Sequence, residues 1–425
     1  MEENMRASMS RSLPVALIGA SLAVTIPASA CANVITDWDA KAIDAVAPLA
    51  SAPSSPYTPY AAYRMMGLVH AAMFDAVNSI ERRYRPYLVQ LPADSAASKE
   101  AAAAAAAAAV LATIDVKTAA QMKGDLASYL TSMPDGAKSE GVKLGEAVAA
   151  KILEARANDG CDAPDDYRPR TTPGVYVPTA IMRGPMWPNA KTFAMVSPSQ
   201  FRPDPPVGLD SGEWAKDLNE IKDYGSQKSA KRTAEQTETA RFWLVTGPVA
   251  YHPFLRQLAI AKEMDVVESA RFMALGGIAI NDALIAVLDA KYHYNFWRPV
   301  TAIRNGDIDG NPATDREATW QPLGDTPMHP EYPCAHCILS GSVAAVVKAV
   351  LGTDDIPEVA MTSPTAPGVT HRWTSTAALT EEVANARIWS GFHYRFSTRV
   401  GTEMGYRIGE YVVKNVMQPV MTRSQ

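Results

Sequence analysis

The stretch that decides the fold is KYHYNFWRPVTAIR, residues 291–304, which combines three cationic side chains with four aromatic rings. It follows a long apolar run over residues 266–290, whose composition predicts a helix. Lys291 and Arg298 are seven residues apart, so a continuous helix would place both on one face. Two neighbouring cations repel each other unless an anion lies between them, which suggests an oxyanion site. The alternative is the basic end of an amphipathic helix, and Pro299 is expected to end that helix beside Arg298.

The composition is that of a globular protein. The chain has 425 residues, of which 47% are hydrophobic and 20% charged, and its formal net charge is -5. That is enough apolar material for one large domain or two smaller ones. Proteins that bind nucleic acids are usually basic, so we expect no nucleic-acid partner.

The N-terminus, residues 1–32, has the pattern of a secretory signal peptide. Arg6 and Arg11 precede or open a short apolar run over residues 13–26, and small residues follow it. We therefore expect an exported protein, either periplasmic or secreted. Lipid attachment at Cys31 is the second choice. No transmembrane helix is expected, since we find no second apolar stretch of sufficient length.

The rest of the chain is predicted to be all-α, a helical bundle with long irregular loops. We divide it into an N-terminal helical half (33–161), a proline-rich irregular segment (162–210) and a C-terminal helical half (211–425) that carries the oxyanion site. A loop is expected over 301–332, because glycine, asparagine and proline interrupt that stretch, and another is expected over 362–373. No strand is predicted.

A second cluster, YPCAHC, ends at Cys337. Pro333 suits the first position of a helix, so the N–H groups of Cys334, Ala335 and His336 would lie at a helix N-terminus, where anions bind readily. His336 can exchange a proton near neutral pH. The cysteines leave two alternatives open: a Cys334–Cys337 disulfide, or half of a zinc site, although no second C-x-x-C or H-x-x-H motif exists.

A third cluster, RIWSGFH, begins at Arg387 and ends at His393. A continuous helix would point these two side chains in different directions. Gly391 is expected to break the helix between them, and the turn could then bring both to one site. The alternatives are a buried ion pair for Arg387 and a core histidine for His393.

The three clusters, K-x6-R-P, P-x-x-H and R-x5-H in this order, resemble the motifs of the vanadium-dependent haloperoxidase and type 2 phosphatidic acid phosphatase superfamily. The aromatic run ending in FWRP resembles the exported haloperoxidase branch in particular. The resemblance covers about residues 266–406. It implies a helical bundle of the acid phosphatase and vanadium haloperoxidase type.

The resemblance also implies a role for each residue. Lys291, Arg298, Arg387 and the N–H of Ala335 would hold the equatorial oxygens of vanadate or phosphate. His393 would be the axial ligand to vanadium, or the nucleophile on phosphorus. The two further catalytic groups would be His336, as acid and base, and Lys291, which would polarise the peroxide.

Three residues depart from the family pattern. Cys334 replaces a serine among the oxyanion-binding positions, and a thiol is the weaker donor. Ala335 replaces a glycine. Ser397 stands where an acid usually orients the final histidine. A fourth residue, His329, lies where bromide-using haloperoxidases have a second histidine, which favours bromide or iodide; the alternative is a loop histidine with no role.

These observations predict a vanadate-dependent haloperoxidase that oxidises halide with hydrogen peroxide. Vanadate is the expected cofactor, with no haem and no nucleotide. The first alternative is an acid phosphatase that acts on a phosphate ester through a phosphohistidine at His393. The second is an inactive protein that binds phosphate-like anions. Assembly as a homodimer is left open.

Overall fold

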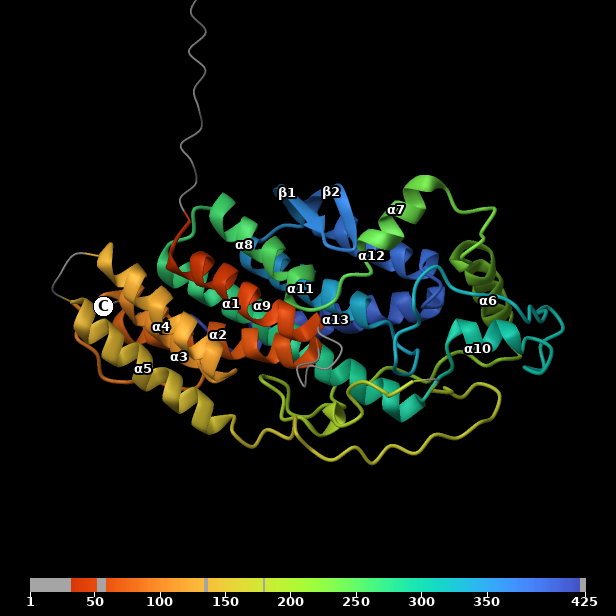
Figure 1. Ribbon diagram of the computed structural model, residues 1–425, viewed down its shortest axis with the longest axis horizontal. Helices are drawn as coiled ribbons and strands as arrows, with labels where there is room; N and C mark the ends of the chain where they lie inside the picture. The colour runs from red at the N-terminus through yellow and green to blue at the C-terminus, as the bar shows by residue number, and fades with distance from the viewer. Residues whose placement is uncertain (1–31, 52–58, 134–136, 179, 421–425) are drawn as a thin grey trace, which may run out of the picture.

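The fold is almost entirely helical, as predicted (Figure 1). The computed structural model describes residues 32–51, 59–133, 137–178 and 180–420. The signal peptide predicted over 1–32 lies outside these ranges except for its last residue. The elements are α1 (Val34–Ser51), α2 (Pro59–Ile80), α3 (Lys99–Leu111), α4 (Val116–Thr131), α5 (Lys138–Ala155), η1 (Trp187–Asn189), α6 (Gly212–Gly225), α7 (Ala234–Phe242), η2 (Pro248–Ala250), α8 (His252–Ala261), α9 (Val266–Tyr294), α10 (Pro299–Arg304), α11 (Ala335–Leu351), β1 (Asp355–Ser363), β2 (Ala366–Ser375), α12 (Thr376–Trp389) and α13 (Arg395–Asn415).

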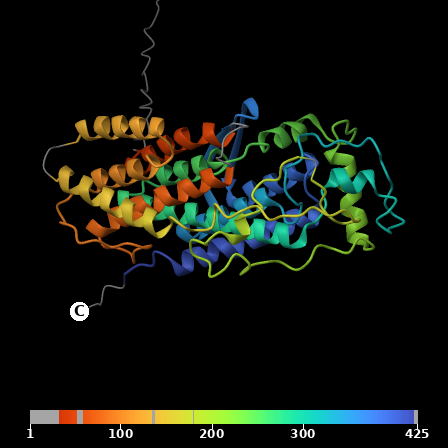
Figure 2. The ribbon, with the colours of Figure 1, turned by 60° about the horizontal axis from the view of Figure 1, so that its bottom comes forward.

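The central element is α9, which packs against α2 on one side and against α11 and α13 on the other. It begins at a capping box formed by Asp265 and Glu268. Figures 1 and 2 show α3, α4 and α5 gathered at one end of the elongated molecule and α6 and α10 at the other. By length and composition α9 could cross a membrane, which the sequence analysis did not foresee, but its most apolar window is fully buried in the protein. It is therefore the core helix of this fold.

Helices α11 and α13 touch through their backbones. On α13, Gly401, Gly405 and Gly409 recur every four residues and share one face. A Cβ added at these glycines would lie 2.6, 2.2 and 2.5 Å from the carbonyl oxygens of residues 334, 338 and 342 of the facing chain. No side chain fits there, so this glycine seam fixes the position of α11, whose N-terminus belongs to the predicted site.

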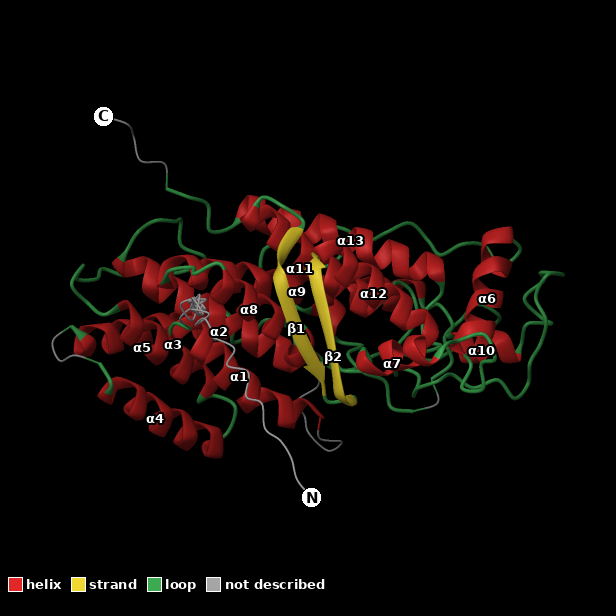
Figure 3. Cartoon of the chain, turned by 90° about the horizontal axis from the view of Figure 1, so that it is seen from above, coloured by secondary structure: helices red, strands yellow, loops and turns green. Residues whose placement is uncertain are grey.

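The one departure from the all-helical prediction is a β-hairpin, seen lying across the helices in Figure 3. Strands β1 and β2 are antiparallel, with Thr362 opposite Thr370 and Val359 opposite Trp373. The loop predicted over 362–373 is therefore wrong. Pro357 lies in β1 and Pro367 in β2. Both strands are edges of a two-stranded sheet, where proline is tolerated.

The irregular segment 162–210 contains only the short η1 among its described residues, and it is fastened along α9. The carboxylate of Asp282 accepts the N–H groups of residues 193–195 at 2.6–2.8 Å. Asp289, seven residues further along α9, forms two hydrogen bonds with Arg202 at 2.7 and 2.8 Å. The two acids share one face of α9 because seven residues are nearly two helical turns.

Candidate active site

Lys291 and Arg298 come to the site from two different helices. Helix α9 ends at Tyr294, and Asn295 follows in the left-handed conformation, with φ at 50°. Arg298 is the N-cap of α10, whose first residue is Pro299. The prediction that one continuous helix places both cations on one face is therefore wrong. The loop predicted over 301–332 also begins too early, because α10 continues to Arg304. The left-handed turn redirects the chain, and both cations end up fully buried.

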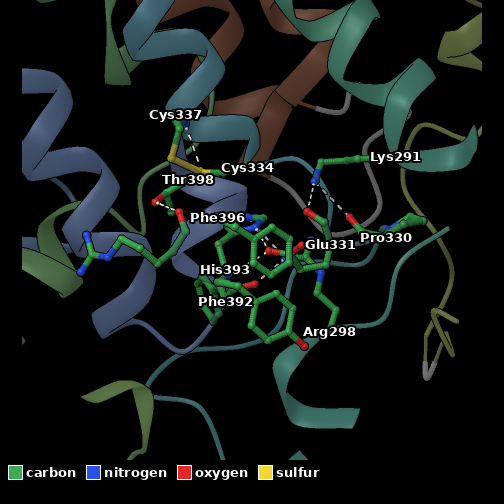
Figure 4. A network of polar contacts seen from close by, with 12 residues as sticks. Lys291, Arg298, Pro330, Glu331, Cys334, Cys337, Phe392, His393, Phe396 and Thr398 are labelled. Carbon is green, nitrogen blue, oxygen red and sulfur yellow. Dashed lines mark hydrogen bonds and ion pairs between the residues drawn. A yellow bond between two sulfur atoms is a disulfide. The ribbon is translucent and has the colours of Figure 1, made fainter. Parts of the chain in front are cut away.

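Main-chain carbonyl groups hold both cations (Figure 4). Lys291 Nζ donates to the carbonyl oxygens of Pro330 at 3.0 Å and of Glu331 at 2.5 Å. Arg298 donates from Nε to the carbonyl of His329 at 2.9 Å and from Nη1 to that of Phe392 at 3.0 Å. The loops at 329–331 and 392 therefore fold around these two side chains.

Arg387 and His393 are brought together by the predicted break at Gly391. Helix α12 ends at Trp389, and Gly391 has a φ of 81°, which favours glycine. Arg387 Nη1 donates to the carbonyl of Trp243, while its buried Nε has no hydrogen-bond partner. The expectation that the turn at Gly391 brings both residues to one site is confirmed, because Arg387 and His393 line one cavity.

The imidazole of His393 is held from both sides. Its Nδ1 lies 2.8 Å from Oε1 of Glu331, and its Nε2 lies 3.4 Å from Nη1 of Arg298. A guanidinium group can only donate, so Nε2 is the acceptor and Nδ1 carries the proton. Glu331 also accepts the N–H of Tyr394 at 3.2 Å. The sequence analysis missed Glu331, because 62 residues separate it from His393.

The N-terminus of α11 differs in detail from the prediction. Cys334 is the N-cap, so Pro333 lies before the helix and not at its first position. A disulfide joins Cys334 to Cys337, which decides the question that the sequence left open and removes the zinc alternative. Both cysteine Cβ atoms face Gly401 of α13. Ala335 and His336 are the first two helical residues, and their N–H groups have no partner within the helix.

Two further histidines complete the site. His336 Nε2 lies 2.9 Å from the carbonyl oxygen of Val245, so this nitrogen carries the proton. His329 Nδ1 lies 3.0 Å from Nη2 of Arg298. Nδ1 also lies 3.1 Å from the carbonyl oxygen of Pro330, so it faces one donor and one acceptor, and each tautomer of His329 satisfies one of these contacts.

Burial controls the protonation of the site. It lowers the pKa of Lys291 well below its usual value, and the nearby Arg298 lowers it further. Burial also lowers the pKa of Arg387 to about 9, that of His336 to about 3 and that of His393 well below normal. The pKa of Glu331 is raised by burial to about 7, against the effect of Lys291 and Arg298. Buried cations of this kind favour an anion as partner.

A cavity of about 360 Å³ opens on these groups. Five predicted residues line it: His329, Ala335, His336, Arg387 and His393. The other three, Lys291, Arg298 and Cys334, are not part of this lining. The opposite wall is apolar and aromatic, and it includes Pro59, Tyr60, Tyr63, Leu244, Leu284 and Leu339.

A second buried cluster consists of Asp39, His70 and His252, whose ligand atoms all lie within 4.8 Å of one another, a spacing that could hold a metal ion. Hydrogen bonds explain it better. Asp39 Oδ1 lies 2.9 Å from one nitrogen of each histidine, and Oδ2 accepts from Arg256 at 2.8 Å. The outer nitrogens, Nδ1 of His70 and Nε2 of His252, are buried without hydrogen-bond partners, whereas metal-bound histidines usually donate the proton of that nitrogen to a neighbour.

The fold and the site define a helical protein with a buried oxyanion-binding centre. Residues 271–422, which contain every predicted site residue, match the family model described as the VCPO second helical-bundle domain. The vanadium chloroperoxidase of Curvularia inaequalis is 30% identical over 196 residues, which cover 38% of this chain and 31% of that protein. The motif-bearing segment is therefore similar to the vanadium haloperoxidases, and the chain spans about a third of the length of this relative.

Solved structures share the fold over most of the chain. A bacterial vanadium-dependent iodoperoxidase superposes with a TM-score of 0.78 at 22% identity, covering 91% of this chain and 98% of that one. The apo form of a bacterial vanadium-dependent chloroperoxidase gives a TM-score of 0.69 at 18% identity, covering 86% and 94%. The helical architecture therefore extends beyond the segment that the family model matches.

Proposed function

We propose that this chain is a vanadate-dependent haloperoxidase that oxidises halide with hydrogen peroxide. The observation that carries the proposal is the charge around His393. Lys291, Arg298 and Arg387 are buried there, and Glu331 is the carboxylate that the described chain places beside them, engaged with His393. Such a site needs an anion to balance its charge.

The donors fit a tetrahedral oxyanion such as vanadate. Arg387 Nε is buried without a partner, and the N–H groups of Ala335 and His336 point out of the start of α11. Together with Lys291 and Arg298 these groups would hold the oxygens, and His393 Nε2, an acceptor, would be the ligand to vanadium. Vanadate, when bound, supplies the Lewis-acidic centre that activates hydrogen peroxide toward halide.

The chain's own residues would handle charge and protons. Arg298 keeps the lone pair of His393 on Nε2, and the Glu331 carboxylate holds the proton on Nδ1. Val245 holds the proton of His336 on Nε2, which leaves Nδ1 as the nitrogen that can accept a proton from hydrogen peroxide. The apolar wall of the cavity excludes water, which strengthens every charged contact inside.

For the halide we propose bromide or iodide. His329 supports this choice, because it lines the cavity and an imidazole N–H can donate a hydrogen bond to a large, weakly hydrated anion. A halide series of chloride, bromide and iodide, at fixed peroxide, measures the preference. Turnover with chloride at the highest rate would contradict the proposal for this site.

For the location we propose export, which rests on the sequence of residues 1–32 alone. N-terminal sequencing of the protein recovered from the periplasm or medium tests it. A mature chain that begins near residue 31 or 33 is expected, and an intact N-terminus in the cytoplasm would contradict it. Lipid attachment at Cys31 would instead appear as an added acyl mass.

The proposed activity is tested by two assays on one preparation. Bromination with bromide, peroxide and added orthovanadate is expected, and hydrolysis of p-nitrophenyl phosphate without vanadate reports the phosphatase alternative. Phosphatase turnover with no bromination at any vanadate concentration would overturn the proposal. If neither activity appears while phosphate still binds, the protein is an anion binder. His393→Ala should abolish whichever activity exists.

A further inference from the structure

Glu331 and Ser397 form an unusual buried pair beside His393. Glu331 lies on the loop before α11 and is fully buried, and Ser397 lies in the first turn of α13 and is fully buried as well. The Ser397 hydroxyl lies beside the Glu331 carboxyl. Neither this hydroxyl nor Glu331 Oε2 has a partner that meets hydrogen-bond geometry, so the carboxyl is held mainly through Oε1.

Both hydrogen bonds of Glu331 Oε1 hold His393 in place. It lies 2.8 Å from His393 Nδ1 and accepts the N–H of Tyr394, the next residue, at 3.2 Å. On the other side of Glu331, its main-chain carbonyl accepts from Lys291. Figure 4 shows Glu331 between Lys291 and His393. One residue therefore links a cation of the site to the imidazole.

We propose that Glu331 is the positioning residue of His393 and that it does from the loop before α11 what an acid at position 397 would do from α13. Its carboxylate holds the proton on Nδ1 and directs the Nε2 lone pair to the oxyanion. The small side chain of Ser397 leaves the space that the Glu331 carboxyl occupies. This inference rests on the proposed function for the identity of the anion.

The alternative is a purely structural contact that joins two loops. The two readings differ in what they predict for the imidazole. If Glu331 only joins loops, its removal lowers stability and leaves the tautomer of His393 unchanged. If it positions His393, its removal frees Nδ1 to lose its proton and lets the neutral ring adopt the other tautomer.

The test uses the full chain with Glu331→Ala, Ser397→Asp and the double variant. The tautomer of His393 is read by NMR of protein labelled with 15N-histidine, which contains seven histidines, and the His393→Ala spectrum assigns its signals. Orthovanadate affinity is measured by calorimetry. Asp217→Ala is the matched control, because this buried carboxylate accepts the N–H of Phe396 at 2.6 Å but is not hydrogen-bonded to a histidine.

In Glu331→Ala only the longer contact of Arg298 with Nε2, at 3.4 Å, still favours the Nδ1–H form. We therefore expect the Nε2–H tautomer to appear beside it and the dissociation constant for orthovanadate to rise about 10- to 100-fold. The double variant should regain the Nδ1–H tautomer and most of the affinity, while Asp217→Ala should change neither. An unchanged tautomer in Glu331→Ala would overturn the inference, as would a double variant that stays as impaired as the single one.

Failure of this inference can be distinguished from failure of the proposed function. The tautomer is read without any anion or halide, so a protein that never brominates still decides the role of Glu331. Bromination by the wild type together with an unchanged tautomer in Glu331→Ala would overturn the inference alone. If Glu331→Ala does not fold, Glu331→Leu is read instead, because its side chain has no acceptor for Nδ1–H; an Nδ1–H tautomer fully retained there would also count against the inference.

Discussion

The glycine seam between α11 and α13 reaches the start of α11. A substitution in the seam can therefore displace the N–H groups of the proposed site without replacing any residue of that site. A Cβ at Gly401 would lie 2.6 Å from the carbonyl oxygen of Cys334, whereas ordinary contacts begin at 3.4 Å. In Gly401→Ala the two backbones must therefore separate by about 0.8 Å, the difference of these two distances. Such overpacking costs about 1–3 kcal/mol, and the better helix propensity of alanine offsets up to about 1 kcal/mol of it.

The matched control is Gly409→Ala, on the same face of α13. Its Cβ would lie 2.5 Å from the carbonyl of Ser342, so the overlap is similar. Ser342 is seven residues from Ala335, which places it roughly 10 Å from the start of α11. We therefore expect both variants to lower the free energy of unfolding by about 1–2 kcal/mol, and Gly401→Ala alone to disturb the site.

Urea unfolding and calorimetric titration with orthovanadate measure the two effects. A shift of this size moves the N–H groups of Ala335 and His336 out of hydrogen-bond range, and each hydrogen bond to a charged group contributes roughly 1.5–3 kcal/mol. Gly401→Ala should thus bind at least about tenfold more weakly than Gly409→Ala. Equal affinities in the two variants would refute the reasoning that the start of α11 holds the anion. Gly124→Ala, whose Cβ would meet nothing within 4 Å, should stabilise the protein slightly.

Three further predictions concern stability. Asp39→Asn should lower the free energy of unfolding by about 3–5 kcal/mol, because it removes the charge that pairs with Arg256, while EDTA or zinc should not shift the melting temperature of the wild type. Asp282→Asn should cost about 1–3 kcal/mol and expose residues 193–195 to limited proteolysis, since an amide cannot accept all three N–H groups. Acid should destabilise the protein, as urea unfolding at pH 7 and pH 5.5 would show. The buried histidines whose pKa is lowered by burial are His70, His329, His336 and His393. They are neutral when folded but take up protons when unfolded below about pH 6.5, so their contribution to stability is present above that pH and lost below it. The raised pKa values of Glu331 and Asp75, about 7 and about 6, act in the opposite direction and offset part of this loss, so we expect a net decrease in the free energy of unfolding from pH 7 to pH 5.5.

The site residues could be predicted from the sequence because each lies in a short motif with a local physical meaning. Gly391 illustrates this. Its φ of 81° cannot continue an α-helix, so the chain turns there and brings Arg387 and His393 to one cavity. Glu331 could not be found in this way. Its partner is remote in sequence, and an acid in a loop is usually solvated, so only the fold shows that this one is buried against an imidazole.

The errors in the fold have a common cause. Residues 362–373 were predicted as loop but belong to the β-hairpin, and α10 was missed because a proline and a short length hide a six-residue helix. In both cases tertiary packing decides the outcome: Val359 and Trp373 are buried in the core, and Arg298 caps α10 while facing the site. Local propensity is weak evidence where a segment is short and its partners are distant.

The same packing explains why the proposed site would favour an anion. Lys291, Arg298 and Arg387 are fastened by carbonyl oxygens, which orient a cation but do not neutralise it, and none of the three forms an ion pair within the described chain. Among the described residues, the Glu331 carboxylate is turned toward His393, and Asp325 lines the same cavity but forms no ion pair with the three cations. The protein without anion therefore carries the unfavourable free energy of buried, unneutralised charge, and a bound oxyanion removes it while gaining the free donors of Arg387 and α11. Affinity for the anion and the instability of the empty site are thus two consequences of one arrangement.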